Sequence, residues 1–382
     1  MKLVHALIFV ALLIWGSTTL ALSARTEIGF TPTYPYYDWL ENVPDWIGVF
    51  AQFDGVHYIT IARQGYAHLG LVQAFFPVYP LLMKFIAIDH SRFAYVIVAG
   101  RVVSIACLFA ITLLWFKQSV FVPDKKSLGM SLAVFLLWPV SFFLFSVYTE
   151  SLFILLVIGS FLLAQKKQWL LAGVLAGYAS GTKIIGVLLF PALLIELAQQ
   201  TNYRYQNTWS WVKKHSQSLL FICLSLVGWL AYSLYLFKTF GDPFLYFNVQ
   251  QDFGGGRQES VVLLPQVVVR YVKMLSSVEL SASWLIIAQE LFLSGIAFTV
   301  LVVGWRKVQF SVWMFSLLAL IIPTLTGTFS SMPRYILSAP AVFLLLGQYA
   351  HQYRWVYMAS IGLSLILLCF NLWLYGQGLW VS

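Results

Sequence analysis

A carboxylate, an imidazole and a phenol lie within five residues of one another near the start of this chain, in Phe53-Asp54-Gly55-Val56-His57-Tyr58. At a membrane surface, Asp54 could act as a general base that takes a proton from a hydroxyl group. The alternative is a loop carboxylate that caps the helix beginning near Val56. His57 and Tyr58 follow at helical spacing and share the side of Asp54. His57 could orient Asp54 or bind a sugar hydroxyl, or it could be an ordinary interfacial histidine.

Three more charged residues lie in short turns between apolar segments: Glu150, Lys183 and Arg334. An ionisable group at membrane depth is a candidate functional residue. Each also has a structural interpretation, because Glu150 would favour the positive end of a helix and either cation could extend from an apolar helix toward water. An acid plus two cations at one membrane face suits a hydroxyl nucleophile and a lipid-phosphate leaving group, since Arg and Lys both bind phosphate.

Membrane helices must position these residues. The chain has 382 residues, of which 60% are hydrophobic and 10% charged, whereas soluble domains carry about 25% charged residues. Long apolar runs without alternation do not fit a membrane β-barrel, so the sequence predicts an all-α polytopic membrane protein with one integral-membrane domain over residues 1–382. We expect about eleven spans, near residues 3–22, 93–116, 128–147, 151–165, 169–182, 184–199, 218–238, 284–304, 309–326, 335–350 and 355–375.

The distribution of charge predicts the topology. Short basic loops alternate with acidic ones, and the positive-inside rule then places the N-terminus inside and the C-terminus outside. Two large external loops are expected, at about 23–92, with juxtamembrane helices, and at about 239–283. The apolar segment 73–90 is not expected to cross, because a crossing would reverse every later loop and because prolines interrupt it. The first apolar run is expected to remain as a span; the alternative is a signal peptide cleaved near residue 24.

Several functional classes are excluded or left open by composition. The formal charge of +9 is explained by the basic inner loops and contact with anionic lipid, so no nucleic-acid partner is expected. The cysteines lie in apolar spans, which supports neither disulfides nor a CxxC metal site. The run Gly254-Gly255-Gly256-Arg257 lacks the ending of a phosphate-binding loop. No nucleotide or redox cofactor is required; a divalent metal has weak support and stays open.

With these residues in view, the chain resembles the PIG-V family of mannosyltransferases, within the GT-C class of polytopic glycosyltransferases, and a bacterial PIG-V-like member is favoured. The matching motifs occur in family order and span most of the chain. They are Phe53-Asp54-Gly55-Val56-His57-Tyr58 with Ile61-Ala62 and Gly65-Tyr66; Ala74-Phe75-Phe76-Pro77 with Tyr79-Pro80; Ser141-Phe142-Phe143 with Tyr148-Thr149-Glu150-Ser151-Leu152-Phe153; Leu171-Ala172-Gly173 through Thr182-Lys183 and Gly186; Gly241-Asp242-Pro243; and Pro333-Arg334-Tyr335.

The resemblance implies a GT-C-type fold, a polyprenyl-phosphate sugar donor and inversion at the anomeric carbon, with Asp54 as the first-loop carboxylate. The hexose would be mannose by preference, and the acceptor a glycan or glycolipid at the outer face of a bacterial cytoplasmic membrane. Arg334 and Lys183 would steady the lipid phosphate, while His57, Tyr58 and Glu150 would shape the sugar site. One departure is Lys183, where similar proteins usually carry Arg; Lys binds phosphate without the fork geometry.

Two other functions remain as alternatives: a transporter or flippase for lipid-linked saccharides, and a non-catalytic assembly subunit. A transporter would line its pathway with polar residues on both sides of the membrane midplane. Here the candidates gather at expected external turns, and only Arg101 and Glu290 fall within spans. Arg101 could pair with Glu290 or reach the interface, and the sequence leaves both readings open.

Overall fold

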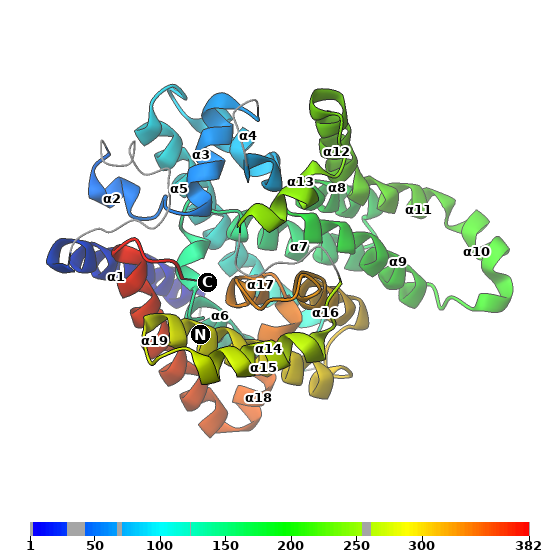
Figure 1. Cartoon of the computed structure of the whole chain (residues 1–382). Coiled ribbons are helices and arrows are strands. Elements are labelled where there is room, and N and C mark those ends of the chain that lie inside the picture. Colours follow the sequence, from blue (N-terminus) through cyan, green and yellow to red (C-terminus); the bar gives the residue numbers. More distant parts are fainter. Residues whose placement is uncertain (1–2, 29–42, 67–70, 123, 254–260, 382) are drawn as a thin grey trace.

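The described part of the protein is helical throughout. The computed structural model describes residues 3–28, 43–66, 71–122, 124–253 and 261–381, and no strand occurs in these ranges (Figure 1). The glycine-rich run at 254–257 and residues 29–42 of the first large loop lie outside the described residues. This confirms the all-α class predicted from the apolar runs.

Five segments are long and apolar enough to cross a membrane: α1 (Leu3–Ile28), α5 (Phe93–Trp115), α11 to α12 (Ser216–Phe240), α15 (Ala282–Gly304) and α19 (Arg354–Gly376). A sixth is obtained if α9 with its preceding turn and α10, which meet at 98°, form one bent span. Shorter apolar helices are α7 (Glu150–Gln165), α8 (Trp169–Ser180) and α16 (Phe310–Thr324). The protein is therefore an integral membrane protein by the length and composition of these helices, while the eleven predicted spans are not confirmed.

Two predicted spans are broken within apolar sequence. The segment 128–147 forms α6 (Leu128–Leu136), then an irregular turn and the short η4 (Ser141–Leu144). The segment 335–350 is divided between α17 (Met332–Leu337) and α18 (Pro340–Gln352). Proline explains the second break, because Pro340 lacks the N–H that a continuous helix would use and is tolerated at the first position of a new one.

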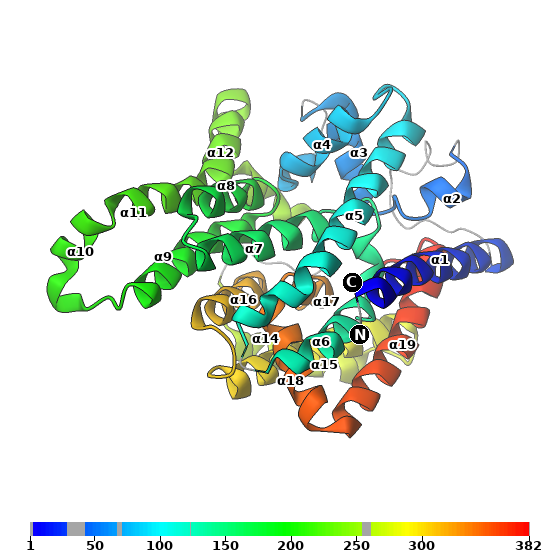
Figure 2. The same ribbon diagram turned by 180° about the vertical axis from the view of Figure 1, so that it is seen from behind.

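The helices pack as pairs that are distant in sequence. α6 lies against α18, α5 against α7, and α1 against α19, so the first and last helices are neighbours (Figure 2). Large aromatic side chains that are fully buried fill the centre, among them Phe142, Phe143, Tyr148 and Tyr375. The other helices are α2 (Asp45–Gly48), α3 (Asp54–Gln64), α4 (Val78–Ile86), α9 (Leu189–Gln200), α10 (Thr208–Lys214), α13 (Leu245–Asn248) and α14 (Leu264–Ser277).

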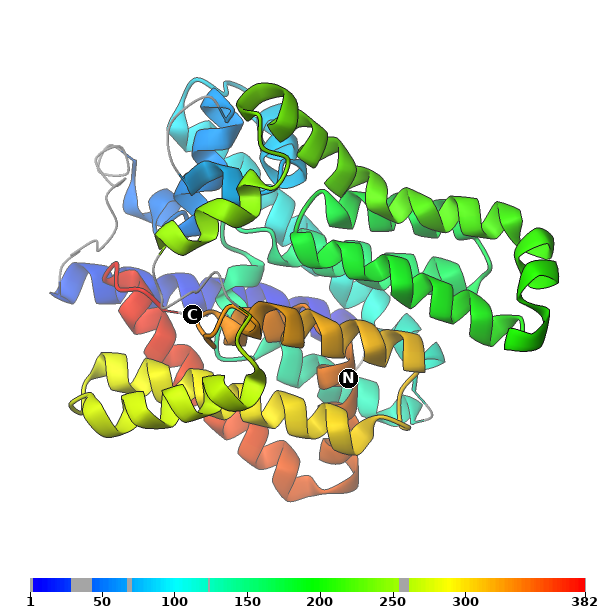
Figure 3. The same cartoon turned by 45° about the vertical axis from the view of Figure 1, so that its right-hand side comes forward.

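Helix α8 carries a glycine stripe that lets α12 approach its backbone closely. Gly173, Gly177 and Gly181 recur every fourth residue, and a Cβ placed on Gly228 of α12 would lie 2.1 Å from the Gly177 oxygen. Small residues at this spacing allow helices to pack in membranes by van der Waals contact. Helices α9 to α12 form an arm that projects from the molecule, and α8 joins this arm to the centre (Figure 3).

The segment 73–90 contains only a short helix. α4 has nine residues and is therefore about 13 Å long, less than half of the ~30 Å hydrocarbon core. It cannot cross a bilayer as one helix, in agreement with the expectation from proline and loop parity. The N–H of Val78 donates to the Gly181 oxygen at 3.0 Å. The start of α4 is thereby fixed beside the end of α8, two residues before Lys183.

Candidate functional site

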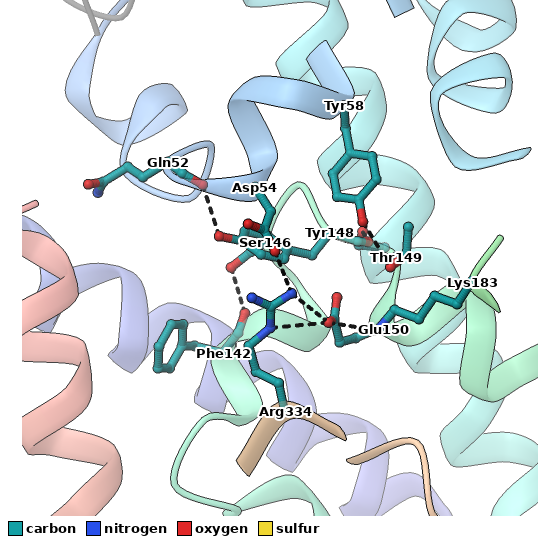
Figure 4. A network of polar contacts seen from close by, with 11 residues as sticks. Gln52, Asp54, Tyr58, Phe142, Ser146, Tyr148, Thr149, Glu150, Lys183 and Arg334 are labelled. Atoms are coloured by element: carbon teal, nitrogen blue, oxygen red, sulfur yellow. Dashed lines mark hydrogen bonds and ion pairs between the residues drawn. The ribbon is translucent and has the colours of Figure 1, made fainter. Parts of the chain in front are cut away.

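Four residues that lie far apart in the sequence converge at the centre of the molecule (Figure 4). Asp54 is the first residue of α3 and Glu150 the first of α7. Lys183 directly precedes the turn at Ile184–Leu188, and Arg334 lies in the first turn of α17. All four were predicted as site residues, and the structure brings them together.

The four side chains form one ion-pair network centred on Arg334 and Glu150. Arg334 Nη2 lies 2.8 Å from Asp54 Oδ2 and 3.2 Å from Glu150 Oε1, and Arg334 Nε also donates to Oε1 at 3.3 Å. Lys183 Nζ donates to the same oxygen at 2.9 Å. Two carboxylates thus balance two cations. This balance is what allows the charges to be buried, because an unpaired buried charge costs several kcal/mol.

The four residues differ in their access to solvent. The Glu150 side chain is fully buried, whereas the Asp54 side chain is 20% exposed and Lys183 is 14% exposed. Among the described residues none bonds to Glu150 Oε2, although this oxygen is buried. Buried polar atoms normally have a partner. Asp54 is thus the carboxylate that an incoming molecule can reach, and Glu150 holds the cations and keeps one acceptor position open.

Aromatic rings support the guanidinium of Arg334. Its Cζ atom lies 4.7 Å from the Phe143 ring centre and 4.9 Å from that of Tyr148, within the range of cation–π attraction. Burial alone would lower the pKa of Arg334, but the carboxylates of Asp54 and Glu150 outweigh it and raise the pKa above its ordinary value. Arg334 therefore remains charged at any physiological pH.

The pKa of Lys183 is shifted downward, opposite to that of Arg334. Burial lowers the pKa of Lys183, and the Glu150 carboxylate opposes this effect. Loss of Glu150 would therefore lower the pKa of Lys183 further and remove the partner that holds its ammonium group.

The backbone turn that presents Asp54 has an unusual geometry. Phe53 has φ +54°, in a region that residues other than glycine rarely adopt, and its ring packs 5.6 Å from Tyr375 and 5.1 Å from Trp380. Gln52 Nε2 donates to the backbone oxygen of Tyr375 at 3.1 Å, and Tyr148 Oη donates to the backbone oxygen of Gln52 at 2.9 Å. The C-terminal segment therefore holds the turn from which α3 begins, and such strain persists only where the surroundings enforce it.

Tyr58 lies beside the network, and His57 lies in a packed aromatic layer. Tyr58 Oη is 3.3 Å from Thr149 Oγ1, one residue before Glu150. The pKa of Tyr58 is raised well above 10 by burial and by the nearby carboxylates. His57 is 2% exposed and stacks on Phe75 with ring centres 4.5 Å apart. Burial lowers the pKa of His57 to about 4, although Asp54 opposes the shift, so its ring is neutral at pH 7.

The structure decides between the two readings of Arg101. Its Nη1 donates to the Trp46 oxygen of α2 at 3.0 Å, and its guanidinium lies 5.0 Å from the Phe50 ring centre. Arg101 thus reaches the first large loop. Glu290 accepts hydrogen bonds from Tyr271 and from the Ser331 N–H.

Some residues of this site were not singled out from the sequence. Phe143, Tyr148 and Thr149 belong to the sequence motif that contains Glu150, and their position before this acid could have marked them as site residues. Nothing in the sequence around Tyr271 marks it in this way. In the described ranges, no group of three or more His, Cys, Asp or Glu residues is placed to hold a metal ion. This finding leaves a dependence on divalent metal untested.

The sequence was compared with protein-family models and with curated proteins, and neither comparison identifies a relative. The chain matches no protein-family model, and no curated protein matches its sequence. The resemblance to the PIG-V family therefore rests on the motifs in the sequence, and the family assignment stays a prediction.

Proposed function

We propose that this membrane protein is an inverting glycosyltransferase that moves a hexose, with mannose as the first candidate, from a polyprenyl phosphate to an acceptor hydroxyl. The observation that carries the proposal is the convergence of Asp54, Glu150, Lys183 and Arg334 in one ion-pair network. The site would face the outside of a bacterial cytoplasmic membrane, and the acceptor would be a glycan or glycolipid. The motifs that resemble PIG-V supply the same four residues.

The two cations suit the phosphate of a lipid-linked donor. A polyprenyl chain stays in the bilayer, so its phosphate comes to a membrane-associated site of low polarity, where charge-assisted hydrogen bonds are strong. Arg334 and Lys183 share the Oε1 atom of Glu150, which keeps the two cations next to each other. Arg334 can offer two parallel N–H groups, and Lys183 a single point charge.

Binding of the donor would also free the base from its ion pair. Arg334 Nη2 lies 2.8 Å from Asp54 Oδ2, and an incoming phosphate would compete with Asp54 for this guanidinium. Asp54 is the more exposed of the two carboxylates, and it would then be free to turn toward the acceptor hydroxyl.

The chemical step follows from this arrangement. Asp54 takes the proton of the acceptor hydroxyl, and the acceptor oxygen attacks the anomeric carbon on the face opposite the phosphate. The bond from that carbon to the phosphate oxygen breaks, and the lipid phosphate leaves with the electron pair, stabilised by Arg334 and Lys183. The configuration at the carbon is inverted. Glu150 would hold the two cations in place, and with His57 and Tyr58 it would shape the walls of the sugar site.

The test is the Asp54→Asn variant in lipid nanodiscs, assayed with labelled polyprenyl-phosphate mannose and a cell-lipid extract as acceptor. Removing a general base should slow transfer by about 10²–10⁴-fold. Asp89→Asn is the matched control, because Asp89 is an acid of the same predicted loop whose side chain contacts its near neighbours Ser91 and Arg92 and lies outside the network. Transfer at the wild-type rate by Asp54→Asn would overturn the mechanism. Movement of the labelled lipid across liposomes without acceptor would indicate transport instead.

A further inference from the structure

A second polar network joins Arg334 to the second large loop. Glu290 of α15 is 5% exposed, and its two oxygens accept hydrogen bonds from Tyr271 Oη at 2.6 Å and from the Ser331 N–H at 3.2 Å. The Tyr271 oxygen in turn accepts from the Phe329 N–H at 3.1 Å. Tyr271 belongs to α14, so a helix of the second loop, an acid of a membrane-spanning helix and the turn before Arg334 are bonded to one another.

The turn before α17 needs such support. Gly327 has φ +88° and Ser331 has φ +66°. A serine rarely adopts this left-handed region, and such a geometry persists only where the surroundings enforce it. α14 supplies further contacts, because Arg270 Nη1 donates to the Gly327 oxygen at 3.1 Å, and just before α14 the Val262 N–H donates to the Leu325 oxygen at 2.9 Å.

The geometry of Ser331 sets the position of Arg334. Ser331 is the N-cap residue directly before α17, and the Arg334 N–H donates to the Ser331 backbone oxygen at 3.0 Å. The guanidinium lies one helical turn further on, 2.8 Å from Asp54. A change in the Ser331 backbone would rotate the first turn of α17 and move the guanidinium away from Asp54 and Glu150.

We propose that Tyr271 and Glu290 are positioning residues that aim Arg334 at its partners, and that α14 thereby sets the affinity of the site for the phosphate of the lipid-linked donor. This inference rests on the proposed function, since it takes that phosphate as the ligand of Arg334. It assigns to the second large loop a role in donor binding.

The experiment measures transfer by the full-length protein in nanodiscs over a range of polyprenyl-phosphate mannose concentrations. Tyr271→Phe should raise the donor KM about tenfold, because it removes the hydrogen bonds that the Tyr271 hydroxyl makes with Glu290, Thr328 and Phe329, with kcat changed less than twofold. Glu290→Gln keeps an acceptor for the Ser331 N–H and should have a smaller effect in the same direction. Tyr246→Phe is the matched control, because Tyr246 is a buried tyrosine of the same loop whose hydroxyl bonds to Trp229.

Combination with Arg334→Lys separates a positioning role from a general structural one. If Tyr271 acts through Arg334, Tyr271→Phe should change the donor KM less than twofold when Arg334 is already lysine. A tenfold effect that persists in that background would overturn the inference, as would a loss of kcat at unchanged KM.

A second measurement keeps the inference testable if the wild-type protein transfers no sugar, in which case the proposed function is what fails. The coupling between Asp54→Asn and Arg334→Lys is measured as the non-additive shift in melting temperature. Tyr271→Phe should at least halve that shift, because a misplaced guanidinium no longer contacts Asp54. An unchanged coupling would overturn the positioning role independently of activity.

Discussion

At the scale of single residues, the network depends on contacts between residues up to 280 positions apart, because Arg334 bridges both carboxylates and Lys183 bonds to Glu150. These partners are set by tertiary structure. The charged residues Asp54, Glu150, Lys183 and Arg334 could nevertheless be selected from the sequence, because each is an ionisable group next to apolar sequence. Tyr271 could not have been selected, because a phenol acquires a role only through the groups that fold against it.

His57 makes folding stability depend on pH. Its pKa is about 4 in the folded protein because of burial, against 6.5 in the unfolded chain, so the unfolded chain takes up the proton first as the pH falls. Its contribution is complete above pH 6.5 and is lost toward pH 4, by about 3 kcal/mol in all. In His57→Phe, which keeps a ring beside Phe75, the melting temperature should therefore fall less between pH 6.5 and 5 than in the wild type.

The control for this prediction is His90→Phe, which removes an exposed histidine and should leave the pH dependence of the melting temperature unchanged. If His57→Phe and the wild type lose stability in parallel between pH 6.5 and 5, then burial does not keep His57 neutral. Melting is followed by tryptophan fluorescence in detergent at fixed ionic strength.

At the scale of elements, the apolar segments were correctly predicted to be helical, but the positions at which two of these helices are interrupted were not predicted. Residues 128–147 and 335–350 are mostly apolar, and hydropathy alone does not show where an irregular turn or a new helix begins. The two turns that matter most carry non-glycine residues with positive φ, Phe53 before Asp54 and Ser331 before Arg334. Nothing in the local sequence predicts this geometry, because packing from distant helices enforces it.

The crossing of α8 and α12 provides a test of packing. A Cβ on Gly177 would lie 2.6 Å from the oxygen of Leu224, in the turn directly before α12, so Gly177→Leu must push α8 and this segment apart. Overpacking of this kind costs about 1–3 kcal/mol, and the melting temperature should fall. Transfer activity should fall too, because α8 ends beside Lys183 and holds the start of α4 through Gly181. The control is Gly295→Leu in α15, where a Cβ would meet open space; equal destabilisation by both variants would show that the glycine stripe has no packing role.

At the scale of the whole molecule, composition alone predicted an all-helical integral membrane protein, and the structure agrees. The number of spans could not be obtained in the same way, because α7, α8 and α16 are apolar but shorter than a membrane-spanning helix usually is. Short helices that pack on one another, as α7 and α8 do, bury the same residues that a lipid-facing span would expose. Hydropathy measures how apolar a segment is, but it does not show whether the segment packs against lipid or against another helix.

The topology predicted from charge connects the network to one face of the membrane and can be tested directly. Ser91 and Gln206 are both exposed and lie in loops predicted to be on opposite sides, before α5 and between α9 and α10. In a background with Cys107, Cys223 and Cys369 replaced by alanine, an impermeant maleimide should label Ser91→Cys in intact cells, and Gln206→Cys only after the membrane is opened. The basic loops would then face the cytoplasm, as the positive-inside rule requires. The reverse labelling pattern would place Asp54 and Arg334 at the inner face, where the donor would have to be a lipid-linked sugar on the cytoplasmic leaflet.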